Sequence, residues 1–93
     1  MSALVSAVEF FAAIGKKVKF TVEASGEGLT YQWQYQKVGS TSWGKTTATG
    51  NKTATLTMGV TEARNGYKYR CQITDSYGST VYSEPATLTA IIP

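Results

Sequence analysis

The chain has 93 residues, and nine lysines and arginines against six aspartates and glutamates give it a formal net charge of +3. This length fits one domain with a single core over residues 1–93, and the scattered cations do not form the dense basic patch of a nucleic-acid-binding protein. One cysteine excludes an internal disulfide, and the absence of histidine removes the commonest metal ligand and general base. The composition therefore argues against an enzyme, and neither a metal ion nor a cofactor is expected.

The first segment, residues 3–14, carries apolar side chains at both odd and even positions. They are Leu4, Val8 and Phe10 on one parity, and Val5 and Phe11 on the other. Ser6 and Glu9 interrupt the segment, which is too short to span a bilayer, so no membrane insertion is expected. Two structures fit the pattern: an edge strand pair with surplus apolar residues on its outer face, or a short helix that a Ser6–Glu9 capping box opens and Gly15 ends.

Period-two alternation of apolar and polar residues predicts the later strands, because successive side chains of a strand point to opposite faces of a sheet. The strands are expected at residues 17–23, 29–36, 43–47, 52–58, 67–74 and 81–90. The segment 67–74 alternates strictly, with Tyr69, Cys71 and Ile73 among its inward residues, and it is expected to be the central strand. The segment 29–36 shows the strongest alternation, with Trp33 on its inward face.

Two places depart from this alternation. Residues 60–66 contain enough helix formers for one helical turn, which we expect to cross from one sheet to the other. The inward parity changes between Val81 and Leu88, so a bulge or kink is expected near Pro85, where a proline also marks an edge strand. The total of seven or eight short strands predicts an all-β sandwich or barrel.

Four landmarks carry a resemblance to a known family. Residues 18–26 resemble a B strand, Trp33 stands where a core tryptophan of strand C belongs, Cys71 matches a strand F cysteine, and Tyr69 lies at the tyrosine-corner position. Over most of its length the chain thus resembles an immunoglobulin-like domain, a two-sheet antiparallel β-sandwich. The phrases 29–35, 54–57 and 63–71 look most like the Ig-like repeats of bacterial cell-surface proteins, which implies an extracellular or cell-surface location for the natural parent.

The chain departs from the family pattern at Val22, which replaces the first cysteine of the disulfide between the sheets. Cys71 is then expected to be a free, buried thiol that packs as a small hydrophobe against Val22 and Trp33. A disulfide closing a loop of this size would contribute about 4 kcal/mol in the chain-entropy model. Packing has to replace that contribution.

The candidate contact residues are apolar or aromatic side chains that the predicted core does not absorb. They are Leu4, Val5, Val8, Phe11, Trp43, Tyr77 and Tyr82. The first four form the surplus of the first segment, and a contiguous exposed apolar patch on a small domain marks a partner site. Trp43 follows a turn and is either a lid over the sheet or an exposed anchor, whereas Tyr77 and Tyr82 are placed for exposure.

These residues favour a non-catalytic structural or protein-binding module, whose partner is another protein or a second copy of the chain. An engineered or designed binder or homo-oligomer on a bacterial Ig-like scaffold is the alternative, and the start Met1-Ser2-Ala3, which lacks the basic region of a signal peptide, fits an excised or engineered module. A carbohydrate-binding module is a remote alternative, with the aromatic residues as its platform.

Overall fold

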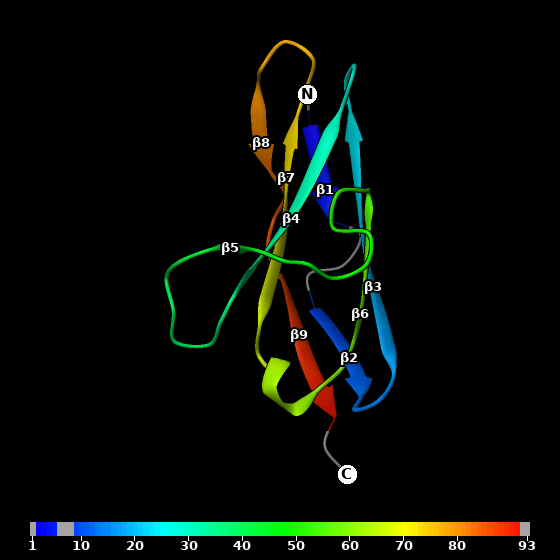
Figure 1. Ribbon diagram of the computed structural model, residues 1–93, viewed down its shortest axis with the longest axis vertical. Coiled ribbons are helices and arrows are strands. Elements are labelled where there is room, and N and C mark those ends of the chain that lie inside the picture. Colours follow the sequence, from blue (N-terminus) through cyan, green and yellow to red (C-terminus); the bar gives the residue numbers. More distant parts are fainter. Residues whose placement is uncertain (1, 6–8, 92–93) are drawn as a thin grey trace.

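The chain folds into two β-sheets in the computed structural model, which describes the backbone of residues 2–5 and 9–91 and the side chains of residues 12–91 (Figure 1). The strands are β1 (Ser2–Val5), β2 (Glu9–Ala13), β3 (Lys17–Ser25), β4 (Thr30–Gln36), β5 (Gly44–Lys45), β6 (Thr55–Gly59), β7 (Lys68–Thr74), β8 (Thr80–Tyr82) and β9 (Ala86–Ile91). The smaller sheet has the order β1-β3-β6, and the larger has the order β2-β9-β7-β4-β5, with β8 also paired to β7. The prediction of an all-β fold is confirmed.

The first segment contributes one strand to each sheet. β1 pairs antiparallel with β3 in the smaller sheet, whereas β2 pairs in parallel with β9 in the larger one. Both lie at the edge of their sheets, which confirms edge strands for this segment, although the two strands pair with β3 and β9 and not with each other. The alternative of a short helix ending at Gly15 is wrong for residues 9–13, because these residues hydrogen-bond to β9 as a strand; residues 6–8 of the predicted capping box lie outside the described residues.

The central strands form where the alternation is strictest. β7 lies between β4 on one side and β8 with β9 on the other, and it pairs with β4 over seven residues. β7 buries one parity, because Tyr69, Cys71 and Ile73 are all buried, and β4 buries Trp33 opposite Cys71. The prediction of a central strand at 67–74 is therefore confirmed.

The 3-10 helix η1 (Glu62–Arg64) connects β6 of the smaller sheet to β7 of the larger one. Thr61 caps it, because the Thr61 side chain accepts a hydrogen bond from the Arg64 backbone N–H at 3.3 Å. This confirms the predicted single helical turn that crosses between the sheets.

The last predicted strand is divided at residues 83–85, so the part of the chain that the structure describes holds nine strands rather than seven or eight. Val81 and Ser83 face inward before the break, and Leu88 and Ala90 are buried after it, which agrees with the predicted change of phase at Pro85. The inference that proline marks an edge strand is wrong for β9, which lies between β2 and β7. Proline has no backbone N–H to donate to a neighbouring strand. Because Pro85 lies between β8 and β9, neither strand loses a hydrogen bond to its neighbour.

One core cluster gathers buried side chains from both sheets. Its buried side chains are Val18, Phe20, Val22, Leu56, Met58 and Val60 from β3, β6 and the residue after it, and Trp33, Tyr69, Cys71, Ile73, Ala86, Leu88 and Ala90 from the larger sheet. The Phe20 ring centroid lies 6.4 Å from that of Trp33 and 5.1 Å from that of Tyr69, so aromatic contacts join the sheets. Val22 and Cys71 belong to the same cluster, and Cys71 is a free, buried thiol as expected.

Candidate functional site

The outward face of strands β4, β7 and β8 is the candidate contact surface. Because β7 buries Tyr69, Cys71 and Ile73, its alternate residues point to the other side of the sheet. The register places Gln34 of β4 opposite Arg70. It also places Gln72 opposite both Gln32 of β4 and Tyr82 of β8, so these polar residues form a contiguous surface.

Arg70 lies at the centre of this surface, between two aromatic rings. Its guanidinium carbon is 4.3 Å from the ring centroid of Trp43 and 4.2 Å from that of Tyr82. Its Nε donates a hydrogen bond to Oε1 of Gln34 at 2.8 Å, and Nε2 of Gln34 donates to Oε1 of Gln72 at 3.4 Å. We call Gln34, Trp43, Arg70, Gln72 and Tyr82 the arginine cluster.

The arginine cluster presents a cation in a fixed orientation. Stacking against two rings and the hydrogen bond to Gln34 restrict the Arg70 side chain, and an ordered side chain loses less conformational entropy when a partner binds. Among the described residues, none accepts a hydrogen bond from its terminal NH₂ groups. Tyr82 remains 50% exposed and Trp43 is partly exposed, so a partner can reach both the rings and the free donors.

Two of the predicted contact residues, Trp43 and Tyr82, are therefore brought together by Arg70, which is not among the predicted contact residues. Trp43 precedes β5 and Tyr82 ends β8, and Arg70 of β7 lies between their rings. Period two places Arg70 on the outward face, which is a signal in the sequence. The two aromatic neighbours follow only from the register of three strands, which the sequence alone does not specify.

Tyr77 is 80% exposed, as expected, but it does not belong to the cluster. It lies in the turn beyond the end of the β7–β8 ladder, where Oδ1 of Asp75 accepts hydrogen bonds from the backbone N–H groups of Tyr77 and Ser79. Its hydroxyl lies 3.4 Å from Oε2 of Glu27 in the neighbouring turn. Tyr77 is thus an exposed ring on a separate part of the surface.

Three of the four candidates of the first segment lie on two strands in different sheets. Leu4 and Val5 belong to β1 and Phe11 to β2, and the structure describes only their backbone; Val8 lies outside the described residues. In the sequence analysis, apolar residues of the first segment count as surplus because a single strand would pack only one of its faces against the core. Each of the two strands can have its own inward parity, so that premise does not hold, and the contact role of these residues stays a prediction.

The inward face offers little chemistry. Burial raises the pKa of the Cys71 thiol to about 12, and a backbone hydrogen bond at Gln32 lowers it by a smaller amount. The thiol therefore stays protonated at neutral pH, and the thiolate is the nucleophilic form of cysteine. Among the described residues no three of aspartate, glutamate, cysteine and histidine are grouped to hold a metal ion.

Neither a comparison with protein-family models nor a search of curated proteins finds a match to this chain. The described part of the chain also contains no helix with the length and apolar character needed to cross a bilayer. The assignment of a function therefore rests on the residues and contacts of the chain itself.

Proposed function

We propose that the chain is an immunoglobulin-like β-sandwich module that acts without catalysis, by binding another protein through the arginine cluster. The grouping of β3 with β6 in one sheet, and of β4, β7 and β9 in the other, supports the family assignment because Ig domains separate strands B and E from strands C, F and G in this way. The buried Trp33 beside Cys71 supports it too. One implied feature is missing: the Tyr69 hydroxyl at the tyrosine-corner position makes no hydrogen bond to another described residue.

The single observation that carries the binding proposal is the position of Arg70 between Trp43 and Tyr82. Tryptophan, tyrosine and arginine are the residues that dominate the energy of protein interfaces, because they combine a large apolar area with hydrogen-bond donors. Here all three are in contact on one partly exposed face. A sugar platform needs a free ring face, and the guanidinium already covers one face of Trp43, so the geometry favours a protein partner over a carbohydrate.

The charge of the face indicates an acidic partner surface. The outward positions of β4, β7 and β8 are occupied by threonines, glutamines, a tyrosine, Lys68 and Arg70, and by no carboxylate. A carboxylate of the partner would meet the free guanidinium donors of Arg70 in a bidentate geometry. The contact would combine this charge-assisted pair with the burial of Trp43 and Tyr82.

The test compares two variants of the purified module. Arg70→Ala removes the centre of the cluster, and Lys52→Ala removes an exposed cation of the turn 50–54, far from it in sequence and outside its contacts. Partners captured by the wild-type protein are purified and titrated with each variant. We expect affinity to fall roughly tenfold or more with Arg70→Ala, as for a buried charged anchor, and to stay unchanged with Lys52→Ala. Equal affinity of wild type and Arg70→Ala for every purified partner would contradict the proposal.

A second candidate function is self-association through the first segment. The observation that favours it is that β1 and β2 are the edge strands of their sheets, and an edge strand has unpaired backbone groups that can pair with a second copy. Light scattering at several concentrations tests it. A dimer that dissociates on Val8→Ser or Phe11→Ser would support this function, including its version as an engineered oligomer, whereas a monomer at every concentration would exclude it.

A further inference from the structure

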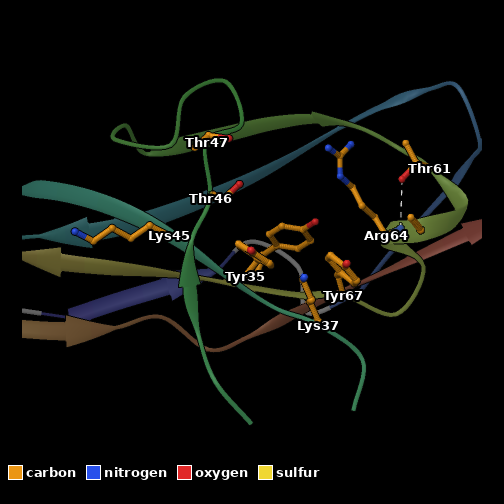
Figure 2. A pocket seen from close by; sticks show the side chains of 10 residues that line it. Tyr35, Lys37, Lys45, Thr46, Thr47, Thr61, Arg64 and Tyr67 are labelled. Atoms are coloured by element: carbon orange, nitrogen blue, oxygen red, sulfur yellow. Dashed lines mark hydrogen bonds between the residues drawn. The ribbon is translucent and has the colours of Figure 1, made fainter. Parts of the chain in front are cut away.

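A pocket of about 430 Å³ opens beside the larger sheet, separate from the arginine cluster (Figure 2). Its lining comes from the end of β4, from residues 45–47 at and after the two-residue strand β5, from η1 with its cap, and from Tyr67 and Tyr69. Trp33 holds the loop of residues 46–54 in place, since its carbonyl accepts a hydrogen bond from the Thr46 N–H at 3.2 Å and its own N–H donates to the Asn51 carbonyl at 2.8 Å. These two hydrogen bonds fix the position of the loop that lines one side of the pocket.

Three tyrosines form one wall of the pocket. Tyr35 of β4 lies directly opposite Tyr69 of β7, and the rings of Tyr35 and Tyr67 stack with centroids 6.0 Å apart and planes 14° apart. None of the three hydroxyls makes a hydrogen bond to another described residue, although Tyr69 is only 2% exposed. Burial raises the pKa of Tyr69 to about 12, so its hydroxyl remains a donor at neutral pH. The wall therefore combines an aromatic surface with three unused donors.

Cations and threonines supply the rest of the polar lining. Arg64 is held by η1, and its Nη1 donates to the Gly59 carbonyl at 2.7 Å, which leaves the other guanidinium donors available. Figure 2 shows the Arg64 and Tyr35 side chains projecting into the same space, while Lys45 extends away from them. Lys37 and three threonines also line the pocket, and none of the lining residues is acidic. The pocket thus offers positive charge and hydrogen-bond donors with no carboxylate to receive them.

We propose that this pocket binds a small organic anion, an aromatic carboxylate. The carboxylate accepts hydrogen bonds from the Arg64 guanidinium and the tyrosine hydroxyls, and the aromatic body packs against the stacked rings of Tyr35 and Tyr67. Pockets of roughly 300–1,000 Å³ bury most of the surface of a small ligand, so this volume suits such a molecule. The carboxylate comes either from a free aromatic acid or from an acidic residue next to an aromatic one in a polypeptide, and the two sources differ in the test below.

The test titrates ¹⁵N-labelled protein with 2-naphthoate, with neutral 2-naphthamide, and with a blocked Glu-Phe dipeptide, and follows backbone amide signals. We expect 2-naphthoate to shift the signals of Tyr35, Thr46, Arg64 and Tyr67, and to bind at least roughly tenfold more tightly than the amide, because a charge-assisted hydrogen bond is lost with the carboxylate. Tighter binding of the dipeptide than of 2-naphthoate would assign the carboxylate to a polypeptide. Absence of binding at millimolar concentrations, or equal affinity for naphthoate and naphthamide, would overturn the proposal.

Three variants connect the binding to the pocket. Arg64→Gln should weaken 2-naphthoate roughly tenfold, and Tyr67→Phe, which keeps the ring and removes one hydroxyl, should weaken it roughly threefold. Lys52→Gln removes a cation outside the pocket and should leave the affinity unchanged. Arg64→Gln could also alter the fold, because it removes the hydrogen bond to the Gly59 carbonyl. Tyr67→Phe keeps that bond and therefore tests the site independently. The proposed site would be contradicted if Tyr67→Phe left the affinity for 2-naphthoate unchanged and the amide signals that shift belonged to residues outside the pocket. Arg70→Ala should not affect this binding, so failure here is distinct from failure of the arginine cluster.

Discussion

Two neighbouring residue pairs of the β4–β7 ladder differ in almost every property. Trp33 lies opposite Cys71 on the inward face, and Gln34 lies opposite Arg70 on the outward face, one residue further along. Trp33 and Cys71 are completely buried, whereas Gln34 and Arg70 are partly exposed and joined by a 2.8 Å hydrogen bond. The strands are the same, and only the direction of the side chain changes.

One strand pair thus supplies buried side chains to the core on one face and the proposed contact surface on the other. The inward pair contributes through burial of apolar area, which is the main favourable contribution to folding. The outward pair contributes little to folding because its charged and polar groups are solvated in the unfolded chain as well. Substitutions on the two faces should therefore separate the free energy of unfolding from the affinity for a partner.

The largest effect is expected for Trp33→Ala on the inward face. Loss of the Trp33 ring removes its contact with Phe20 and leaves a cavity. In the wild type, Nε1–H of Trp33 donates a hydrogen bond to the Thr53 carbonyl at 2.8 Å, and the variant removes this donor. The free energy of unfolding should fall by about 3–5 kcal/mol, measured by urea denaturation. Trp33→Phe keeps most of the ring and should cost clearly less; an equal loss in both variants would mean that the indole N–H, not packing, is the dominant contribution.

A smaller effect is expected for Cys71→Ser, which exchanges a thiol that packs as a hydrophobe for a hydroxyl in the same buried space. The contact of the thiol with the Gln72 carbonyl is long, at 3.8 Å, so a hydroxyl in its place would be poorly satisfied. The free energy of unfolding should fall by about 1–3 kcal/mol. Cys71→Ala provides the control, because it removes the sulfur without adding a polar group. A Cys71→Ser variant more stable than Cys71→Ala would contradict the apolar role of this position.

Alkaline pH should also act on the inward face. The thiol of Cys71 ionises near its ordinary pKa of 9.0 in the unfolded chain, and burial raises that pKa to about 12 in the folded one. Its contribution to stability is therefore complete below pH 9.0 and is lost as the pH rises toward the folded value, because only the unfolded chain releases the proton in between. Tyr69 adds a similar loss above its ordinary pKa of 10.0, since burial raises its pKa to about 12.

Unfolding curves of wild type and Cys71→Ala measured at several pH values check this expectation. The stability of the wild type should decrease more steeply above pH 9.0 than that of Cys71→Ala, which has no thiol to ionise. Parallel curves for the two proteins would show that the thiol is already accessible to solvent in the folded state.

The smallest effect on stability is expected for Arg70→Ala on the outward face. It removes two cation–π contacts and the hydrogen bond to Gln34, all on a partly exposed surface, so the free energy of unfolding should fall by less than about 1 kcal/mol. Affinity for an acidic partner should fall strongly in the same variant. Lys52→Ala, which removes an exposed cation outside this face, is the matched control. A loss of stability in Arg70→Ala as large as that in Trp33→Ala would remove the distinction between the two faces.

Local alternation predicted most of the strands but not their bounds. Residues 17–23 and 67–74 correspond to β3 and β7 within two residues, because one buried face imposes a strict period of two. The strand expected at 52–58 begins only at Thr55, because residues 50–53 form a turn in which the Thr53 N–H donates to the Gly50 carbonyl at 2.9 Å. Gly50 has a φ of 80°, a conformation that favours glycine, and this turn signal overrides the weak alternation next to it.

The sequence alone was enough to predict which side chains face inward in residues 17–23, 29–36 and 67–74, because this depends only on the geometry of neighbouring residues along one strand. It placed Trp33 and Cys71 in the core and Arg70 outside. The placement of β1 and β2 in different sheets, and the contact of Trp43 and Tyr82 with Arg70, are visible only in the three-dimensional structure. The physical reason is that strand order and register join residues far apart in the chain, and their interaction energies are summed over the whole core, so no local pattern of residues specifies them.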